Sequence, residues 1–256
     1  MQLSIAIPNI VEYNIDANLQ KVLSQLQISA NSREIPDSPM LVLFPETVLT
    51  GLVISDDYDT DRLYALEITS TPITQICKQA EANKIWVAFG FIELAHGALY
   101  DTALLVNDNG EIALHQRRLT KGWCNPNAPR NKYGYGTKLA TTITPWGKAA
   151  FLICGDLFHV PQIAADEKLD LLLFPYARCF GNISQPTPQQ EWDINEWPAY
   201  ATQVRAAGAK ITLGANYIAP EKDSPFGGGF GGGFIANKDG NLLKSVPLQT
   251  EAIVVH

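Results

Sequence analysis

The sequence predicts an α/β layered fold with a mixed β-sheet. Short apolar segments of strand length alternate with segments of helical periodicity along the chain. Three Gly-containing turns join neighbouring apolar segments as β-hairpins, which excludes a purely parallel sheet. We find no long polar linker and no repeat of fixed period, so residues 1–256 are expected to form one domain.

In the first part of the chain, predicted strands alternate with a predicted helix. Residues 3–7 alternate apolar with small or polar side chains, and residues 41–44 form a short apolar run that Pro45 stops. These two segments are predicted strands. Between them, apolar side chains recur at helical spacing, which predicts an amphipathic helix over residues 18–30.

The next part adds a helix and the first hairpin. Thr71-Pro72 is a favourable helix start, and a helix is expected over residues 71–83, followed by a strand over 85–92. Two further strands, 103–106 and 112–115, flank an Asn-Asp-Asn-Gly turn.

The remaining elements continue the alternation, with two more hairpins around Pro145-Trp146-Gly147-Lys148 and around residues 237–240. Helices are expected over 160–168 and 197–209. The predicted strands cover residues 141–144, 149–153, 171–174, 211–215, 234–236 and 242–246. The glycine-rich run 227–233 lacks the Lys-Ser/Thr of a phosphate loop, and is interpreted as a mobile flap or as close backbone packing.

Composition narrows the function classes. A hydrophobic content of 46% with 18% charged residues is typical of a soluble globular protein, and the net charge of −7 argues against nucleic acid or an anionic membrane as a partner. The N-terminus lacks the basic segment of a signal peptide, so a cytoplasmic location is expected. The four cysteines form no CxxC pair and do not cluster with histidines, so no metal site is expected.

Cys154 is the principal candidate for a nucleophile. It ends the apolar run 149–153 and precedes Gly155-Asp156, so its thiol is expected where a strand opens to solvent. A helix N-terminus there would favour the thiolate. The alternative is a buried structural cysteine, because free cysteine is among the most buried residue types.

Two further polar positions follow apolar strands. Glu46 comes directly after residues 41–45 and is a candidate general base, with an exposed loop glutamate as the alternative. Arg117, Arg118 and Lys121 follow the strand 112–115, and a cation there could hold an oxyanion, with a solvated basic patch as the alternative. With the Cys154 thiol, such groups meet the requirements of acyl transfer through a thioester. Spacing alone does not show that they converge.

Several segments resemble those of the nitrilase superfamily, also called the carbon–nitrogen hydrolase family. Phe44-Pro45-Glu46 followed by Leu49-Thr50-Gly51 resembles the segment with the family's catalytic glutamate, and residues 153–158 with Pro161 resemble the segment with its catalytic cysteine. The order of matching segments covers nearly the whole chain; the others are Asn18-Leu19, Tyr100-Asp101-Thr102-Ala103, Phe174-Pro175, Trp197, Arg205-Ala206-Ala207, Asn216 and residues 226–240.

The resemblance implies a four-layer α-β-β-α sandwich with mixed sheets, and commonly a pair of sandwiches stacked in eight layers. It also implies a Glu-Lys-Cys triad, no cofactor, and a small-molecule substrate with an amide, carbamoyl, ureido or nitrile group. A homodimer or higher homo-oligomer is therefore expected.

The chain departs from this pattern at the lysine. Arg118 occupies the position of the family lysine, and Lys121 is three residues later. We prefer Lys121 as the cation, because Trp123-Cys124 resembles a sequence that follows the lysine in aliphatic amidases. An arginine cannot copy the compact ammonium of a lysine.

A second departure is that residues 122–153 contain no acidic residue, whereas many members carry a further glutamate there. Asn125, Asn127 or Pro129 stands near the expected place.

Substrate contacts are predicted for Tyr176, Arg178, Trp123 and Asn127. A surface salt bridge is the alternative for Arg178, and aromatic core packing is the alternative for Trp123.

The expected function is hydrolysis of a non-peptide C–N bond, with amides or carbamoyl compounds favoured over nitriles. Two alternatives stay open. One is a non-catalytic family member that binds a small molecule or a partner protein, and the other is an amide-forming transferase or a lyase in a biosynthetic pathway.

Overall fold

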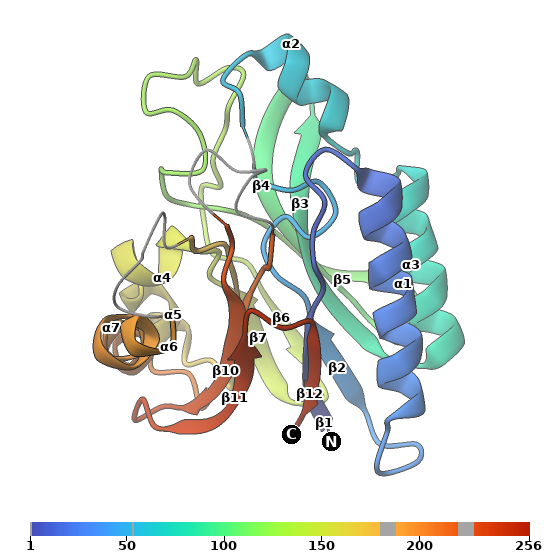
Figure 1. The fold of residues 1–256 in the computed structure, drawn as a ribbon, viewed down its shortest axis with the longest axis vertical. Coiled ribbons are helices and arrows are strands. Elements are labelled where there is room, and N and C mark those ends of the chain that lie inside the picture. Colours follow the sequence, from blue (N-terminus) through green and yellow to red (C-terminus); the bar gives the residue numbers. More distant parts are fainter. Residues whose placement is uncertain (1, 53, 180–187, 220–227) are drawn as a thin grey trace.

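The computed structural model describes residues 2–52, 54–179, 188–219 and 228–256. Two six-stranded sheets pack face to face, and helices cover both outer faces (Figure 1). This arrangement is the predicted four-layer α-β-β-α sandwich. The first and last strands pair antiparallel, so the two termini lie side by side at one end of the sheets (Figure 1).

The first sheet has the strand order β12-β1-β2-β3-β4-β5. Its strands are β1 (Gln2–Ile7), β2 (Met40–Leu43), β3 (Trp86–Ala95), β4 (Ala98–Val106), β5 (Ile112–Arg117) and β12 (Ala252–Val255). Strands β1, β2 and β3 run parallel, and the other pairs are antiparallel. Parallel neighbours need a crossover, which helices α1 (Ile15–Asn31) and α3 (Thr71–Asn83) provide.

The second sheet repeats this plan with the order β11-β10-β9-β8-β7-β6. Its strands are β6 (Thr141–Thr144), β7 (Gly147–Phe151), β8 (Leu171–Tyr176), β9 (Ile211–Asn216), β10 (Gly231–Asn237) and β11 (Leu242–Leu248). Strands β7, β8 and β9 are parallel. Shorter elements complete the described chain: α2 (Tyr58–Asp61), a 3₁₀ turn (Arg62–Tyr64), α4 (Gly155–His159), α5 (Gln162–Glu167), α6 (Pro188–Glu191), a π-helical turn (Trp192–Glu196) and α7 (Trp197–Ala207).

Side-chain alternation along the strands builds three apolar layers. In β2, Leu41 and Leu43 face the second sheet, while Met40 and Val42 face α1 and α3. In β8, Leu172 packs under α5 and α7 on the opposite outer face. Strands buried on both faces read as continuous apolar runs, which is why β2 and β8 were recognisable from the sequence.

Most predicted elements are present, and the helix 71–83 has the predicted bounds. The prediction missed β12, whose pairing with β1 depends on residues at opposite ends of the chain. It also missed α4, which is too short to show a period.

The glycine-rich run is described from residue 228 onward; Gly227 lies outside the described residues. A Cβ on Gly233 would lie 2.5 Å from the carbonyl oxygen of Gly214 in the neighbouring strand. In its described part, the run therefore matches the close-packing interpretation.

Candidate active site

Polar residues follow the parallel strands of both sheets at the same end of the molecule. The segments that follow β1 and β9 pair in parallel, because Ile10 donates its backbone N–H to the carbonyl of Ile218 at 2.7 Å. The two sets of parallel strands therefore point the same way, away from the termini (Figure 1). Glu46 after β2 and Cys154 after β7 consequently belong to one edge of the sandwich.

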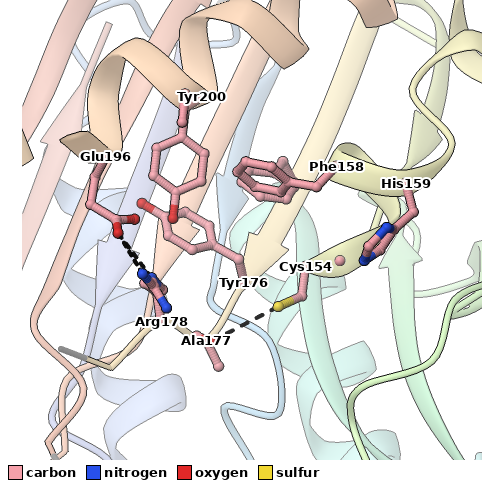
Figure 2. Close-up of a pocket in the computed structure, with 11 residues that line it drawn as sticks. Cys154, Phe158, His159, Tyr176, Ala177, Arg178, Glu196 and Tyr200 are labelled. Atoms are coloured by element: carbon pink, nitrogen blue, oxygen red, sulfur yellow. Dashed lines mark hydrogen bonds and ion pairs between the residues drawn. The ribbon is translucent and has the colours of Figure 1, made fainter. Parts of the chain in front are cut away.

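Cys154 stands at a strained turn between β7 and α4. Its φ of 46° and ψ of −108° are unfavourable for a residue with a side chain. Its backbone N–H donates to the carbonyl of Pro175 at 3.0 Å, which ties the turn to β8. The thiol is half-buried and lies 3.9 Å from the carbonyl oxygen of Ala177 (Figure 2).

Glu46, in the loop after β2, is fully buried. The chain after β2 passes so close to β3 that a Cβ on Gly90 would lie 3.0 Å from the Cα of Glu46. Burial is the largest cause that raises the pKa of Glu46 well above its usual range; the charges of Asp101 and Cys154 raise it further, and Arg118 opposes them. A carboxyl group in this environment fits general acid–base chemistry.

Arg118 lies between the carboxyl group of Glu46 and the turn at Cys154. It is only 5% exposed, and its Nη1 donates to Glu46 Oε1 at 3.0 Å. On the other side, a Cβ added to Gly155 would lie 2.6 Å from Nη2 of Arg118, so the guanidinium fills the space beside the residue after Cys154. Burial disfavours its charge, but Cys154, Glu46, Asp101 and Asp156 outweigh burial and raise the pKa of Arg118.

The structure brings Arg118, and not Lys121, to Glu46. Lys121 is exposed, and its backbone carbonyl accepts a hydrogen bond from Arg118 Nη2 at 3.2 Å. Alternation along β5 gives the physical reason: Gln116 faces the space between the sheets, and Arg118 continues that side two residues later. The geometry therefore corrects the preference for Lys121.

Asp156 binds the loop after β5 to the turn at Cys154. Its carboxylate accepts hydrogen bonds from the backbone N–H groups of Leu119 at 3.0 Å, Thr120 at 2.9 Å and Ile153 at 3.2 Å, and from the Thr120 hydroxyl at 2.8 Å. An aspartate in a turn commonly bonds to its own local backbone, as Asp156 does here through the bond from Ile153. The bonds to Leu119 and Thr120 show that it also crosses to a distant loop.

A separate ionic cluster lies on the other face of β5. Glu93 accepts a bidentate pair from Arg117 at 2.8 Å, and also bonds to His115 and Thr102. Burial alone would raise the pKa of Glu93, but the hydrogen bonds from Arg117, His115 and Thr102 outweigh it and lower the pKa to about 2. This cluster anchors the end of β5 beside Arg118.

A cavity of about 340 Å³ opens at the thiol. Figure 2 shows Tyr176, Tyr200 and Phe158 around it, with Arg178 paired to Glu196 at 2.8 Å. Burial, Glu196 and Cys154 raise the pKa of Tyr176, whose buried hydroxyl has no hydrogen-bond partner among the described residues.

Of the four residues predicted to contact substrate, only some line the cavity at the thiol. Tyr176 and Arg178 line the cavity with Cys154. Trp123 is buried against Tyr133 and Tyr135, and borders a second hollow that also includes Arg178. Asn127 is exposed and lines neither space; its backbone N–H bonds to the side chain of Asn125 in a local turn.

The described residues contain no group of three or more His, Cys, Asp or Glu side chains placed to hold a metal ion. None of the described helices combines the length and apolarity needed to cross a lipid bilayer.

Fold and site together define a class of protein: an α-β-β-α sandwich with a cysteine, a buried carboxyl group and a cation gathered at one edge. The family model described as carbon-nitrogen hydrolase matches residues 1–256, and the chain belongs to that family.

Sequence relatives cover different shares of the chain. An aliphatic nitrilase of Sinorhizobium fredii is 22% identical over 86% of this chain and 68% of its own length. A cyanide hydratase of Stereum hirsutum is 22% identical over 69% of this chain and 50% of its own length.

Solved structures share the fold. A carbon–nitrogen hydrolase from Helicobacter pylori has a TM-score of 0.77 at 16% identity, covering 100% of this chain and 88% of that one. A mutant of the amidase from Nesterenkonia sp. AN1, in which acrylamide has added to the active-site cysteine, has a TM-score of 0.72 at 15% identity, covering 100% of this chain and 92% of that one.

Proposed function

We propose that this chain hydrolyses a non-peptide C–N bond of a small amide or carbamoyl compound through a thioester on Cys154. The observation that carries the proposal is the position of Arg118. Its guanidinium contacts Glu46 at 3.0 Å and also fills the space beside Gly155, next to the nucleophile. A base, a cation and a thiol are therefore gathered within one cluster.

In the first half-reaction, sulfur attacks the carbonyl carbon and the thiol proton passes to the carboxylate of Glu46. Arg118 and the backbone N–H after Cys154 stabilise the negative charge on the carbonyl oxygen. The C–N bond breaks as Glu46 returns the proton to the leaving nitrogen, which leaves a thioester. Water then attacks the thioester, loses its proton to Glu46, and the sulfur departs as a thiol when that proton is returned.

The size and lining of the cavity beside Cys154 favour a substrate whose acyl group is compact and partly aromatic. Its volume of about 340 Å³ is near the lower end of the roughly 300–1,000 Å³ range of ligand pockets. Phe158, Phe174 and Tyr200 supply apolar walls, while the unpartnered hydroxyl of Tyr176 can bond to a polar atom of the bound group.

Intact-mass spectrometry tests the proposal. The protein is mixed with a panel of aliphatic and aromatic amides, carbamoyl compounds and nitriles, and the mass of an acyl adduct on Cys154 is sought. We expect an adduct from at least one amide or carbamoyl compound, and none in Cys154→Ala. Turnover by Cys154→Ala at the wild-type rate would refute the thioester route.

A second candidate is a non-catalytic member of the family that binds a small molecule or a partner protein. It is favoured by the engagement of Arg118 by two carboxyl groups and by the Lys121 carbonyl, which leaves little of the guanidinium for substrate. Iodoacetamide separates the two candidates. Labelling of Cys154 well above the rate of a free peptide thiol supports the enzyme, and labelling at that rate supports the binding protein.

A further inference from the structure

Asp101 lies in the middle of the proposed site, although no motif assigned it a role. It is 1% exposed and sits in β4 opposite Ile92, on the side that faces the second sheet. The backbone N–H of Arg118 donates to the Asp101 carbonyl at 2.8 Å. The two residues are therefore held together by the main chain as well as by their side chains.

One guanidinium nitrogen serves two buried carboxyl groups. Nη1 of Arg118 lies 3.0 Å from Glu46 Oε1 and 3.4 Å from Asp101 Oδ2. Two ionised carboxylates with a single cation would leave one buried negative charge uncompensated, which is strongly unfavourable. Within the described residues, Glu46 Oε2 and Asp101 Oδ1 are also buried without a hydrogen-bond donor.

A single proton held between the two carboxyl groups resolves both problems. It removes the second charge and supplies the missing donor. The charge of Asp101 is one of the causes that raise the pKa of Glu46. The charges of Cys154 and Arg118 also act on Glu46, Asp156 acts on Arg118, and Glu46 acts on the Tyr217 hydroxyl.

We propose that Asp101 is a positioning residue that shares one proton with Glu46, so that the cluster of Glu46, Asp101 and Arg118 is neutral overall. The inference rests on the proposed function for its catalytic meaning. The sequence contains no acidic residue between Lys121 and Cys154, so Asp101 supplies the site's second carboxyl group from β4.

The proton balance of the reaction is unchanged by this pairing. The pair carries one proton and one negative charge at rest, accepts the thiol proton when the C–S bond forms, and passes one proton to the leaving nitrogen. It then accepts a proton from water and returns it to the sulfur as the thioester breaks. Asp101 keeps the proton of Glu46 in place between these steps.

Infrared difference spectroscopy tests the shared proton without any substrate. The carbonyl stretch of a protonated carboxyl group at pH 7 is expected in wild type and is expected to be lost in Asp101→Asn, because Glu46 then pairs alone with Arg118 and ionises. Glu93→Gln is the matched control: Glu93 is buried but fully ionised at pH 7, so this variant retains the band. A wild-type minus Asp101→Asn difference spectrum without the band overturns the inference.

A second measurement reports on the thiol. Asp101→Asn removes the shared proton with Asp101 and leaves Glu46 as one ionised carboxylate, so the net charge of the cluster is unchanged. The pH midpoint of iodoacetamide labelling of Cys154 is therefore expected to coincide with that of wild type. A midpoint lower by about one unit, as loss of an ionised Asp101 would produce, would contradict the pairing. If Asp101→Asn does not fold, Glu46→Gln replaces it in the infrared test. The shared proton requires that this variant also lack the carbonyl band.

The outcomes separate this inference from the proposed function. Absence of any acyl adduct from the substrate panel refutes the hydrolase and leaves the infrared result valid. Adduct formation with an unchanged band and a lowered labelling midpoint in Asp101→Asn refutes the shared proton alone.

Discussion

Replacement of Arg118 by methionine, which keeps much of the side-chain volume and removes the charge, tests the interior of this site most directly. At 3.0 Å and an effective dielectric constant of about 20, the attraction of the guanidinium to one carboxylate is about 5 kcal/mol before desolvation. Desolvation offsets part of this, and loss of one partner of a buried ion pair typically destabilises by about 3–5 kcal/mol. We expect Arg118→Met to lower the free energy of unfolding by about 3 kcal/mol at pH 7.

Urea unfolding followed by circular dichroism measures this loss, with the m-value as a check that the variant unfolds in a comparable transition. The loss is expected to shrink toward pH 4, because Glu46, whose pKa is raised, is then protonated and no longer needs the cation. A loss below about 1 kcal/mol at pH 7, or one that grows as the pH falls, would refute the assigned charges.

Arg118→Lys is the companion variant, since it retains the charge and places a lysine at the family's usual position. The ammonium cannot donate in the planar fork that serves Glu46 and the Lys121 carbonyl together. We expect Arg118→Lys to recover about half of the stability lost in Arg118→Met. Full loss in both variants would show that shape, and not charge, is what this position requires.

The remaining predictions concern three positions around the same cluster. Glu93→Gln is expected to lower the free energy of unfolding by about 2–3 kcal/mol at pH 7, because the pKa of Glu93 falls from 4.5 to about 2 on folding. In urea titrations at several pH values, this loss should fade between about pH 5 and pH 2. A loss that is constant with pH would contradict the prediction. Glu46→Gln is expected to raise the free energy of unfolding by roughly 0.5–2 kcal/mol. The gain should increase as the pH rises above 4.5, because the raised pKa of Glu46 means that the folded state loses stability when that carboxyl group ionises. A gain that is largest at acid pH would contradict this prediction. Gly155→Ala places a methyl group 2.6 Å from Arg118 Nη2 and is expected to destabilise by about 1–3 kcal/mol and to slow labelling of Cys154 at least tenfold; an unchanged labelling rate would show that the guanidinium does not act on the thiol.

Much of the fold could be predicted because its cause is local. The apolar runs of β2 and β8 and the helical spacing of α1 are visible in single segments. The pairing of β12 with β1 was not visible, because it joins the two ends of the chain. Cys154 and Glu46 were identifiable as residues that follow buried strands, and their association with Arg118 was not.

The choice of the cation illustrates the limit. Sequence spacing left Arg118 and Lys121 open, and the preference went to Lys121. In the structure, the alternation of side chains in β5 carries Arg118 inward, while Lys121 lies beyond the strand and is exposed. Asp101 was noted only as part of a matching segment, because nothing local distinguishes a buried aspartate in a strand from an exposed one.

The amino-acid sequence by itself predicted the layered architecture, because strand and helix periodicity depends on neighbouring residues. Its motifs carried the resemblance to the family, and they offered the thiol and the carboxyl group at the strand ends as candidates. Only the tertiary structure decided which cation meets them and which second carboxyl group joins them. Charges buried 17 and 72 residues apart along the chain interact through space, and their distances are set by how two sheets pack and not by any local pattern.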